Sequence, residues 1–532
     1  MDSSAHYLPY SDTGFFSTLL TDYVASNVQL SNFYEHQVNY KGISAAIKQR
    51  EKFNTKRELL VQVLTKKYQH VGTSAKQLHN IQQLLQPNTF TITTAHQPNI
   101  FTGHLYFIYK ILHAVKVADE LNTTMPDKHF IPIYYMGSED ADLDELGHVF
   151  IDGTKYTWQT EQTGAVGRML VDENLIGILK KISGQLLVHP FGQQIMDVMC
   201  HCYTIGITIE QATFLLVNQL FGQFGLLVLL PDNEDLKASF LPIIAKELTE
   251  QFSHKKVQET ATIFPPAYKL QASGRPINLF YLQHQSRKRI EWNGQQFNVV
   301  DTNVVFSKQA MLAEFTNHPE KCSPNVILRP IFQEWVLPNI AFIGGGGEIG
   351  YWLELKKVFD AAEVPYPMLI VRNSFLIIEQ QQQQLINKLQ LSTLEMFKDT
   401  LTIINNFVQK SSTKQLQLTQ ELRQLTAVYQ TIQATAGNID STLATHTAAL
   451  LTIATNKINT LQSKMLRAER KKNEAVVRQI TKLKKQLFPQ NNLQERVENF
   501  MLLYAKHGPS FIQTVYKYSS ALQQQFAIIN LQ

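Results

Sequence analysis

The chain of 532 residues contains only three cysteines and no CxxC pair. Cys200, Cys202 and Cys322 have no second cluster of metal-ligating residues beside them. A disulfide-stapled fold and a zinc site both need more paired ligands than this, so neither is predicted. This cysteine usage favours the reducing cytoplasm.

We also expect neither an export signal nor a membrane span in this sequence. Its first residues, MDSSAHYLPYSD, contain no basic region followed by an apolar stretch. Residues 211–231 are uncharged and long enough to consider as a span, but amide side chains and glycines interrupt them. We predict instead a core helix to about Phe224 and a buried strand from Leu226 to Leu230, in a cytoplasmic protein with no membrane partner.

Charge of one sign is not in large excess, since the formal net charge is only +5. Bulk electrostatics therefore do not require a nucleic-acid partner. One basic run, from Lys464 to Lys485, has nine Lys or Arg residues against two Glu. We interpret it as a solvated flank of a coiled coil, with a nucleotide or tRNA contact as the alternative.

A chain of this length with 44% hydrophobic residues can bury more than one core. Residues 1–88 show helical spacing and are predicted to form a helical lead-in that packs on the core. In residues 89–378, short β-rich runs alternate with helices, which indicates an α/β layer around a mainly parallel sheet. The predicted strands are 91–95, 130–136, 226–230, 341–343 and 368–371, with insertions at about 150–225 and 232–325.

Residues 379–532 are predicted to form a C-terminal coiled-coil and helical domain. Apolar residues from Leu443 to Leu487 mostly follow the three-four spacing of a coiled-coil seam. A single helix of about 48 residues would be about 70 Å long. It must therefore pack against the preceding helices, against a second subunit, or both, and Gly437 with Asn438 is the natural turn before it.

The first motif is TTAHQPNIFTGHLYFIYKIL, residues 93–112, where a strand ends at Ala95 and a helix begins near Gly103. The start of a helix offers unpaired N–H groups and a positive dipole end to phosphate or carboxylate. His96, at the strand end, could carry a proton to or from a ligand. The alternative is a histidine satisfied within a tight turn.

The second motif is GSEDADLDELGH, residues 137–148, again directly after a strand. It crowds five carboxylates into seven residues, and these repel one another unless a cation or an ammonium group joins them. Binding of a substrate ammonium group, coordination of magnesium and general-base action would each use such a cluster. The alternative is a solvated helix start capped by Ser138.

The third motif, residues 328–355, contains Gly344, Gly345, Gly346 and Gly347 between a strand and a helix led by Glu348. Backbone amides of such a loop can surround an anion. No Walker lysine follows and the GxGxxG spacing is not clear, so a P-loop or dinucleotide site is poorly supported. A structural glycine hinge is the alternative. The side chains that could add anion and amide contacts are Arg329, Gln333 and Asn339.

These motifs, with GLLVLLPD at 225–232, NLFYL at 278–282 and SPNVILRP at 323–330, resemble the bacillithiol cysteine-adding enzyme family. The resemblance runs in order from about Tyr7 to the C-terminus. It implies a Rossmann-like core related to class I aminoacyl-tRNA synthetases, and a coiled coil that supports a homodimer. It also implies a ligase that joins L-cysteine to glucosaminyl malate by an amide bond, the last step of bacillithiol biosynthesis. ATP is the expected cosubstrate, with Mg²⁺ as an optional companion.

The resemblance and the motif chemistry together suggest roles for individual residues. The candidate catalytic residues are His96, Glu139, Asp140 and Asp142, with His96 or one of the acids as the base. The candidate substrate-binding residues are Ser138, His148, Asn278, Arg329, Gln333, Asn339, Glu348, Tyr351 and Arg372, of which the arginines suit malate carboxylates. The candidate phosphate-binding residues are Asn99, Gly103, Gly344, Gly345, Gly346 and Gly347. No metal ligand is assigned.

Two other functions stay open. An amino-acid-activating enzyme could charge another acceptor, and a noncatalytic coiled-coil scaffold could carry a degenerate Rossmann core. No lysine-rich KMSKS signature is evident. The ligase interpretation requires the three loops near His96, Asp140 and Gly345 to converge at one edge of one sheet.

Overall fold

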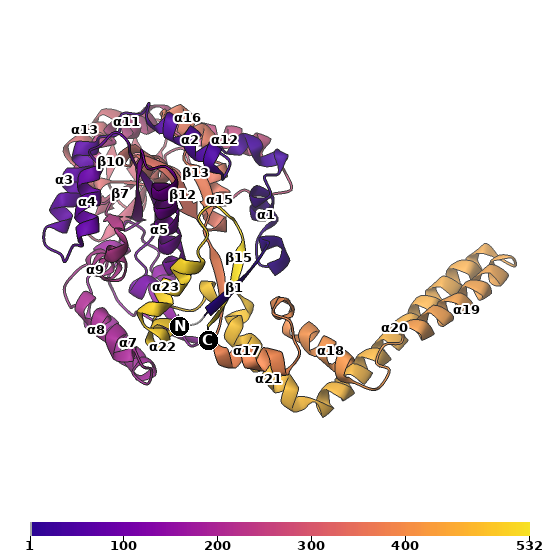
Figure 1. Cartoon of the computed structure of the whole chain (residues 1–532). Coiled ribbons are helices and arrows are strands. Elements are labelled where there is room, and N and C mark those ends of the chain that lie inside the picture. The colour runs from indigo at the N-terminus through magenta and orange to yellow at the C-terminus, as the bar shows by residue number, and fades with distance from the viewer. Residues whose placement is uncertain (1–2, 532) are drawn as a thin grey trace. The chain divides into compact units, whose positions relative to one another are not determined.

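The computed structural model describes residues 3–531 and divides into two compact units, coloured along the chain in Figure 1. Unit 1 runs to Ile377 and resumes at Asn492, and unit 2 comprises Ile378–Asn491. The sequence division kept residues 379–532 together, whereas here the chain after 491 groups with unit 1. No helix among the described residues is long and apolar enough to cross a lipid bilayer.

Unit 1 is built around a five-stranded parallel sheet in the order β13-β12-β2-β3-β6. Its strands are β2 (Thr89–His96), β3 (His129–Met136), β6 (Leu227–Leu229), β12 (Asn339–Gly344) and β13 (Met368–Val371). The apolar runs of the sequence predicted all five, because parallel strands are covered on both faces and need apolar residues throughout. The α/β class is therefore confirmed.

Helices α2 (Tyr40–Arg50) and α5 (Tyr106–Thr124) share one apolar cluster with the sheet. Ile43 and Ala46 of α2 and Val117 of α5 lie in this cluster with Ile92 and Ile343 of the strands. The lead-in is helical, as predicted. Its other helices are α1 (Thr18–Val24), α3 (Arg57–Tyr68) and α4 (Ala75–Gln83).

The first insertion carries a short ribbon and three helices. These are β4 (His148–Ile151), β5 (Thr154–Thr157), α7 (Glu173–Leu186), α8 (Gly192–Cys202) and α9 (Ile209–Phe221). Helix α9 followed by β6 confirms the interpretation of the uncharged stretch as a core helix and a buried strand. The short helix α6 (Leu143–Leu146) precedes this insertion.

The second insertion contains helices and an antiparallel sheet in the order β10-β9-β8-β7-β11. Its helices are α10 (Glu234–Ser239), α11 (Leu241–Glu250), α12 (Phe252–Ile263) and α13 (Lys308–Asn317). The strands are β7 (Leu279–Gln283), β8 (Ser286–Trp292), β9 (Phe297–Val299), β10 (Val305–Phe306) and β11 (Cys322–Pro324). Helices α14 (Arg329–Val336), α15 (Gly346–Leu353) and α16 (Lys356–Ala362) then flank the last two strands of the parallel sheet.

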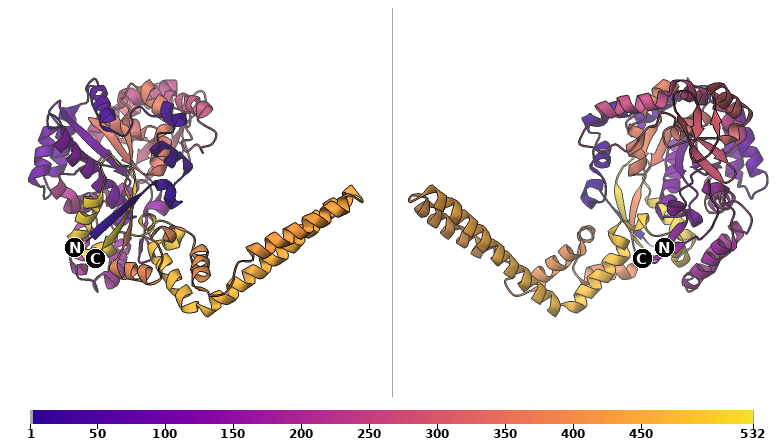
Figure 2. Two further views of the ribbon diagram at one scale, coloured as in Figure 1. Left: turned by 45° about the vertical axis from the view of Figure 1, so that its right-hand side comes forward. Right: turned by 180° about the vertical axis from the view of Figure 1, so that it is seen from behind.

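A third sheet has the order β1-β15-β14 and brings the two ends of the chain together (Figures 1 and 2). Strand β1 (Ser3–Leu8), which the helical lead-in did not predict, pairs antiparallel with β15 (Phe526–Leu531). The third strand is β14 (Ser374–Ile378), and helices α22 (Met501–His507) and α23 (Pro509–Tyr518) precede β15. This pairing explains why the C-terminal residues belong to unit 1.

Unit 2 is helical, and its longest helices form an antiparallel hairpin that is visible in Figure 2. Its helices are α17 (Gln380–Lys388), α18 (Thr400–Ser411), α19 (Thr419–Gly437), α20 (Ser441–Lys472) and α21 (Glu474–Leu487). The turn follows Gly437, as predicted. The expected single helix of about 48 residues is interrupted at Asn473, whose side chain donates to the Glu469 carbonyl and so competes with helical hydrogen bonding.

Candidate functional site

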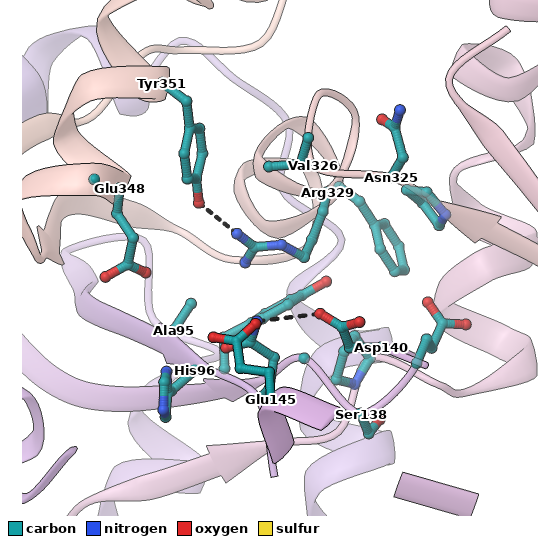
Figure 3. A pocket seen from close by; sticks show the side chains of 18 of the residues that line it. Ala95, His96, Ser138, Asp140, Glu145, Asn325, Val326, Arg329, Glu348 and Tyr351 are labelled. Atoms are coloured by element: carbon teal, nitrogen blue, oxygen red, sulfur yellow. Dashed lines mark hydrogen bonds between the residues drawn. The ribbon is translucent and has the colours of Figure 1, made fainter. Parts of the chain in front are cut away.

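A cavity of about 580 Å³ opens at the carboxyl edge of the parallel sheet. His96 ends β2, Asp140 follows β3, and Gly345 follows β12, and all three line this cavity. The predicted convergence of the three loops is therefore confirmed. In Figure 3, Glu348, Tyr351 and Arg329 lie on one side of the cavity, and His96, Glu145 and Asp140 lie on the other.

Some of the predicted site residues line the cavity and others do not. Those that line it are His96, Ser138, Glu139, Asp140, Arg329, Gly345, Gly346, Gly347, Glu348, Tyr351 and Arg372. Those that the structure places elsewhere are Asn99, Gly103, Asp142, His148, Asn278, Gln333, Asn339 and Gly344.

His96 is held as a neutral side chain. Its ring packs against Tyr106 and Phe107, at centroid distances of 5.4 and 5.6 Å, and its Nε2 is buried. Burial, and after it the nearby Lys110 ammonium, lowers the pKa of His96 well below its usual value. A proton on His96 would create a buried cation beside Lys110, whereas a carboxylate attracts an ammonium group and loses its own charge on taking the proton.

Asp140 and Glu145 are the cavity's open carboxylates. The Asp140 side chain accepts from Gln97 Nε2 at 3.1 Å and from the Asp142 amide at 3.2 Å. Within residues 3–531, neither Asp140 nor Glu145 forms an ion pair with a cationic side chain. Burial, followed by repulsion from Asp140 and Asp142, raises the pKa of Glu145. These two acids can therefore receive an ammonium group and take its proton.

Glu139 is bound by the chain's own cations. It forms an ion pair with the buried Lys237, which also lies 2.7 Å from Asp232, and Asp232 receives two hydrogen bonds from Arg168 at 2.6 and 2.8 Å. Burial raises the pKa of Glu139, although the Lys237 ammonium opposes this. Ser323 donates to its other oxygen at 3.2 Å. Sequence reasoning expected a ligand to supply the cation for Glu139, but Lys237 of the chain supplies it.

The glycine loop presents the start of α15 to the cavity, but a carboxylate of the chain lies there too. Glu348 accepts from the Gly345 amide at 2.8 Å and pairs with Lys110 at 2.6 Å. Lys110 is buried and also donates to the Ala95 carbonyl at 2.6 Å. Burial lowers the pKa of Lys110. A phosphate at this helix start would lie beside a neutralised carboxylate–ammonium pair.

The two arginines assigned to carboxylates differ in their freedom. Arg329 donates to the Tyr351 hydroxyl at 2.6 Å and forms no ion pair within the described chain. Arg372 is buried and pairs with Glu495 at 2.6 Å. Arg329 is therefore open to a ligand anion, whereas Arg372 is largely occupied.

Three predicted residues serve the fold. Asn339 donates to Glu334 at 2.7 Å and accepts from Thr93 at 2.8 Å, and Gln333 donates to Glu334 at 2.9 Å. Asn278 donates to Ser253 Oγ at 2.7 Å and is fully buried. These amides satisfy buried polar groups in place of a ligand, because an unpaired buried polar group is costly.

The other residues away from the cavity also have local roles. Asp142 caps α6 by accepting from the Glu145 amide, and His148 Nδ1 lies 2.8 Å from the Asp144 carbonyl oxygen. Gly103 has φ +65°, and a Cβ there would lie 2.7 Å from the Asn99 side chain, so the loop needs glycine. Gly344 is hemmed in likewise: a Cβ there would lie 2.8 Å from the Phe342 ring.

Sequence reasoning missed several side chains that line the cavity. Arg287 of β8 lies over the Phe280 ring at 3.9 Å and donates to Ser323 at 2.9 Å. Lys110 lies among the apolar residues of α5, and only its charge could have indicated from the sequence that it belongs to a site. Within the described chain, seven cationic residues line the cavity against four acids. The cations are Lys110, Arg275, Arg287, Arg289, Arg329, Arg372 and Arg496, and the acids are Glu139, Asp140, Glu145 and Glu348.

A polar cavity with charges of both signs, placed at the carboxyl edge of a Rossmann-like sheet, is typical of an enzyme domain. Two family models match the chain: the N-terminal Rossmann-like domain of bacillithiol biosynthesis BshC over residues 4–373, and the BshC C-terminal coiled-coil domain over residues 375–531. The chain therefore belongs to the BshC family of bacillithiol biosynthesis.

Relatives match over nearly their whole length. A protein of Flavobacterium johnsoniae is 35% identical, with 98% of this chain and 99% of the relative covered. Proteins of Flavobacterium psychrophilum and Christiangramia forsetii are 35% and 34% identical, with 98% of each chain covered. All three carry the name "Putative cysteine ligase BshC". In residues 3–531 no group of three or more His, Cys, Asp or Glu side chains is arranged to hold a metal ion.

Proposed function

We propose that the protein joins L-cysteine to glucosaminyl malate by forming an amide between the cysteine carboxyl group and the glucosamine amine. The family and the names of its members support this reaction. The observation that carries it is a single cavity with open charges of opposite sign, Asp140 and Glu145 against Arg329. Both substrates carry an ammonium group and at least one carboxylate, and so match this arrangement.

In this proposal the amine of glucosaminyl malate lies at Asp140 and Glu145. Its malate carboxylates lie at Arg329 and Arg287, whose guanidinium groups have no carboxylate partner within the described chain. Malate binding by Arg372, as first expected, is less well supported because Glu495 holds that guanidinium. His96 supports the loop from a buried position.

A carboxylate is a poor electrophile, so the cysteine carboxyl group needs activation. We propose ATP as the cosubstrate, with its phosphates near Gly346 and Gly347 and Mg²⁺ as their counter-ion. The start of α15 and the Lys110 ammonium face this part of the cavity. They are suited to stabilise the negative charge that builds up on the leaving group.

Amide formation is then a displacement at the activated acyl carbon. The amine nitrogen attacks the activated acyl carbon, the new C–N bond forms, and the C–O bond to the leaving phosphoryl group breaks. Asp140 or Glu145 takes the proton that the ammonium group must lose before attack, and the second proton that the nitrogen loses after attack leaves with the departing phosphate. Holding both substrates in one cavity supplies much of the rate, because reaction within a complex avoids the entropy cost of an encounter.

The test is a reconstitution with purified protein, cysteine, glucosaminyl malate and one nucleotide at a time, read by mass spectrometry. The expected result is the cysteinyl amide with ATP and none without a nucleotide. Cysteine-dependent nucleotide cleavage without glucosaminyl malate would favour an enzyme that charges another acceptor. Binding of neither cysteine nor nucleotide in calorimetry would favour the scaffold.

The exposed apolar residues of unit 2 are the basis for proposing its partner. Leu443, Leu450, Ile453 and Leu461 of α20 are each at least 41% exposed, although they follow coiled-coil spacing. Apolar side chains in such a row are stabilised when a further helix covers them. We propose that the hairpin of a second copy does so in a homodimer, which light scattering would detect as a doubled mass.

A further inference from the structure

The segment that follows unit 2 in the chain, residues 493–499, builds part of the cavity wall in unit 1. We call it the return segment. The Glu498 carbonyl accepts from the Leu105 amide at 2.7 Å, and the Asn499 amide donates to the Phe150 carbonyl at 3.0 Å. The segment therefore contacts both the first site motif and β4, although 398 positions separate Asn499 from Phe101 in sequence.

Glu495 fixes Arg372 from this segment. It is fully buried and accepts from Arg372 at 2.6 Å, from the Ser374 hydroxyl at 3.1 Å and from the Phe375 amide at 3.2 Å. The Arg372 guanidinium also lies over the Tyr106 ring, 5.0 Å from its centroid. Glu495 thus neutralises one of the two guanidinium groups at this end of the cavity.

Asn499 fixes the first motif. Phe101 and Thr102 have backbone φ values of +52° and +70°, which residues other than glycine rarely adopt. The side-chain Nδ2 of Asn499 donates to the carbonyls of Phe101 at 2.9 Å and Gly103 at 2.6 Å. These two hydrogen bonds hold the strained turn. The return segment therefore holds Arg372, which lines the cavity, and the turn that leads into α5, whose Tyr106 and Lys110 also line it.

Arg496 lies between these two supporting residues and lines the cavity itself. It is half-buried, yet within residues 3–531 its guanidinium has neither an ion pair nor a hydrogen-bond acceptor. Burial, and next the Arg372 charge, lowers the pKa of Arg496. The Glu495 carboxylate opposes this shift from a distance, but it is paired with Arg372. A half-buried guanidinium without a direct partner is stabilised when an anion joins it.

We propose that Arg496 binds an oxyanion of a substrate, a carboxylate or a phosphate, so that the return segment is part of the binding site. The proposed function supplies the identity of the two candidate ligands, glucosaminyl malate and ATP. The subsite itself rests on the geometry around Arg496. Arg496 would be a third cation without a carboxylate partner for the ligand anions, beside Arg287 and Arg329.

The test is calorimetric binding to the full-length protein, with Arg496→Gln compared with wild type. The ligands are glucosaminyl malate, L-malate, ATP and inorganic pyrophosphate, each alone. Loss of one charge-assisted contact should raise Kd roughly ten- to a hundredfold for one pair of ligands. Weaker binding of the two malate compounds identifies a carboxylate subsite, and weaker binding of ATP and pyrophosphate identifies a phosphate subsite.

Two further variants sharpen this test. Arg496→Lys keeps the charge and should recover part of the affinity, whereas Arg423→Gln removes an exposed charge from α19 and should leave every Kd unchanged. Equal affinities in wild type and Arg496→Gln, or no binding of any of the four anions, would overturn the subsite. A protein that makes no amide but binds these anions through Arg496 would overturn the proposed function and leave the subsite standing.

Discussion

The two units bury their apolar residues very differently. In unit 1, strands β12 and β13 are buried at every position, and β2 at all but its last. In unit 2, helix α19 has no buried residue and α20 has only Thr447. Tertiary packing therefore fixes the sheet, whereas the hairpin depends on helix-local interactions and on whatever covers its apolar row.

The charges differ in the same way. Arg372 and Glu495 of unit 1 form an ion pair whose side chains are 4% and 0% exposed. Arg478 and Glu474 of unit 2 lie 3.9 Å apart with side chains 73% and 68% exposed. Water and salt screen the second pair, so its contribution to stability is small, whereas each member of the first pair depends on the other. Substitutions in the two units should therefore have effects of different size.

The largest effect is expected for Asp140→Asn. An amide cannot take the ammonium proton, so amide formation should fall about 100-fold or more while the melting temperature stays within a few degrees. Mass spectrometry of the product and a thermal melt measure the two quantities. Asp144→Asn, on the exposed side of the same acidic cluster, is the matched control. Normal product yield from Asp140→Asn would remove Asp140 from the proposed mechanism.

Glu495→Gln should destabilise unit 1 most. It leaves the Arg372 guanidinium buried without a counter-charge, which costs roughly 3 to 5 kcal/mol. Urea unfolding followed by tryptophan fluorescence reports unit 1, since Trp158, Trp292, Trp335 and Trp352 all lie there. Glu421→Gln of α19 should leave that transition where it is. If the two variants unfolded at the same urea concentration, the contrast between buried and solvated charges would be lost.

Much of the fold could be predicted from the sequence because burial leaves a pattern. The five apolar runs predicted the five parallel strands, and the ends of parallel strands share one edge, so His96, Asp140 and Gly345 were expected to converge. The break in the helix at Asn473 was not predicted, because the coiled-coil spacing of apolar residues continues through it. A single side-chain hydrogen bond accompanies the change of backbone conformation there.

The site was less predictable because tertiary contacts decide which polar groups are open. Asn339 and Asn278 lie in motifs like those of ligand-binding residues, yet both satisfy buried partners. Glu139 and Asp140 are neighbours in sequence, but only Glu139 meets Lys237. Arg496 follows the coiled coil, and no local pattern connects it with Arg372. Long-range pairing of this kind becomes visible only in three dimensions.

A smaller effect is expected from pH. Burial, and after it the Asp232 charge, raises the pKa of Glu210 in α9 from 4.5 to about 7, and Glu139 acts in the same direction. The folded state therefore holds a proton that the unfolded state has lost, so wild-type stability should decline by about 1 to 3 kcal/mol between pH 4.5 and 7. Glu210→Gln should flatten this slope in urea titrations. An unchanged slope would mean that Glu210 titrates normally.

The smallest effect on unfolding is expected in the hairpin. Ile343→Ala in β12 should cost about 2 to 5 kcal/mol, because it leaves a cavity in a packed sheet. Leu461→Ala in α20 removes a side chain that is 52% exposed and should cost about 0.5 kcal/mol or less in a monomer. If a second copy covers Leu461, the loss should grow with protein concentration, because a dimer's stability depends on concentration. Circular dichroism melts of Leu461→Ala at two protein concentrations distinguish these cases. A large loss of stability that does not depend on concentration would mean that the side chain of Leu461 is packed within its own hairpin, contrary to its exposure.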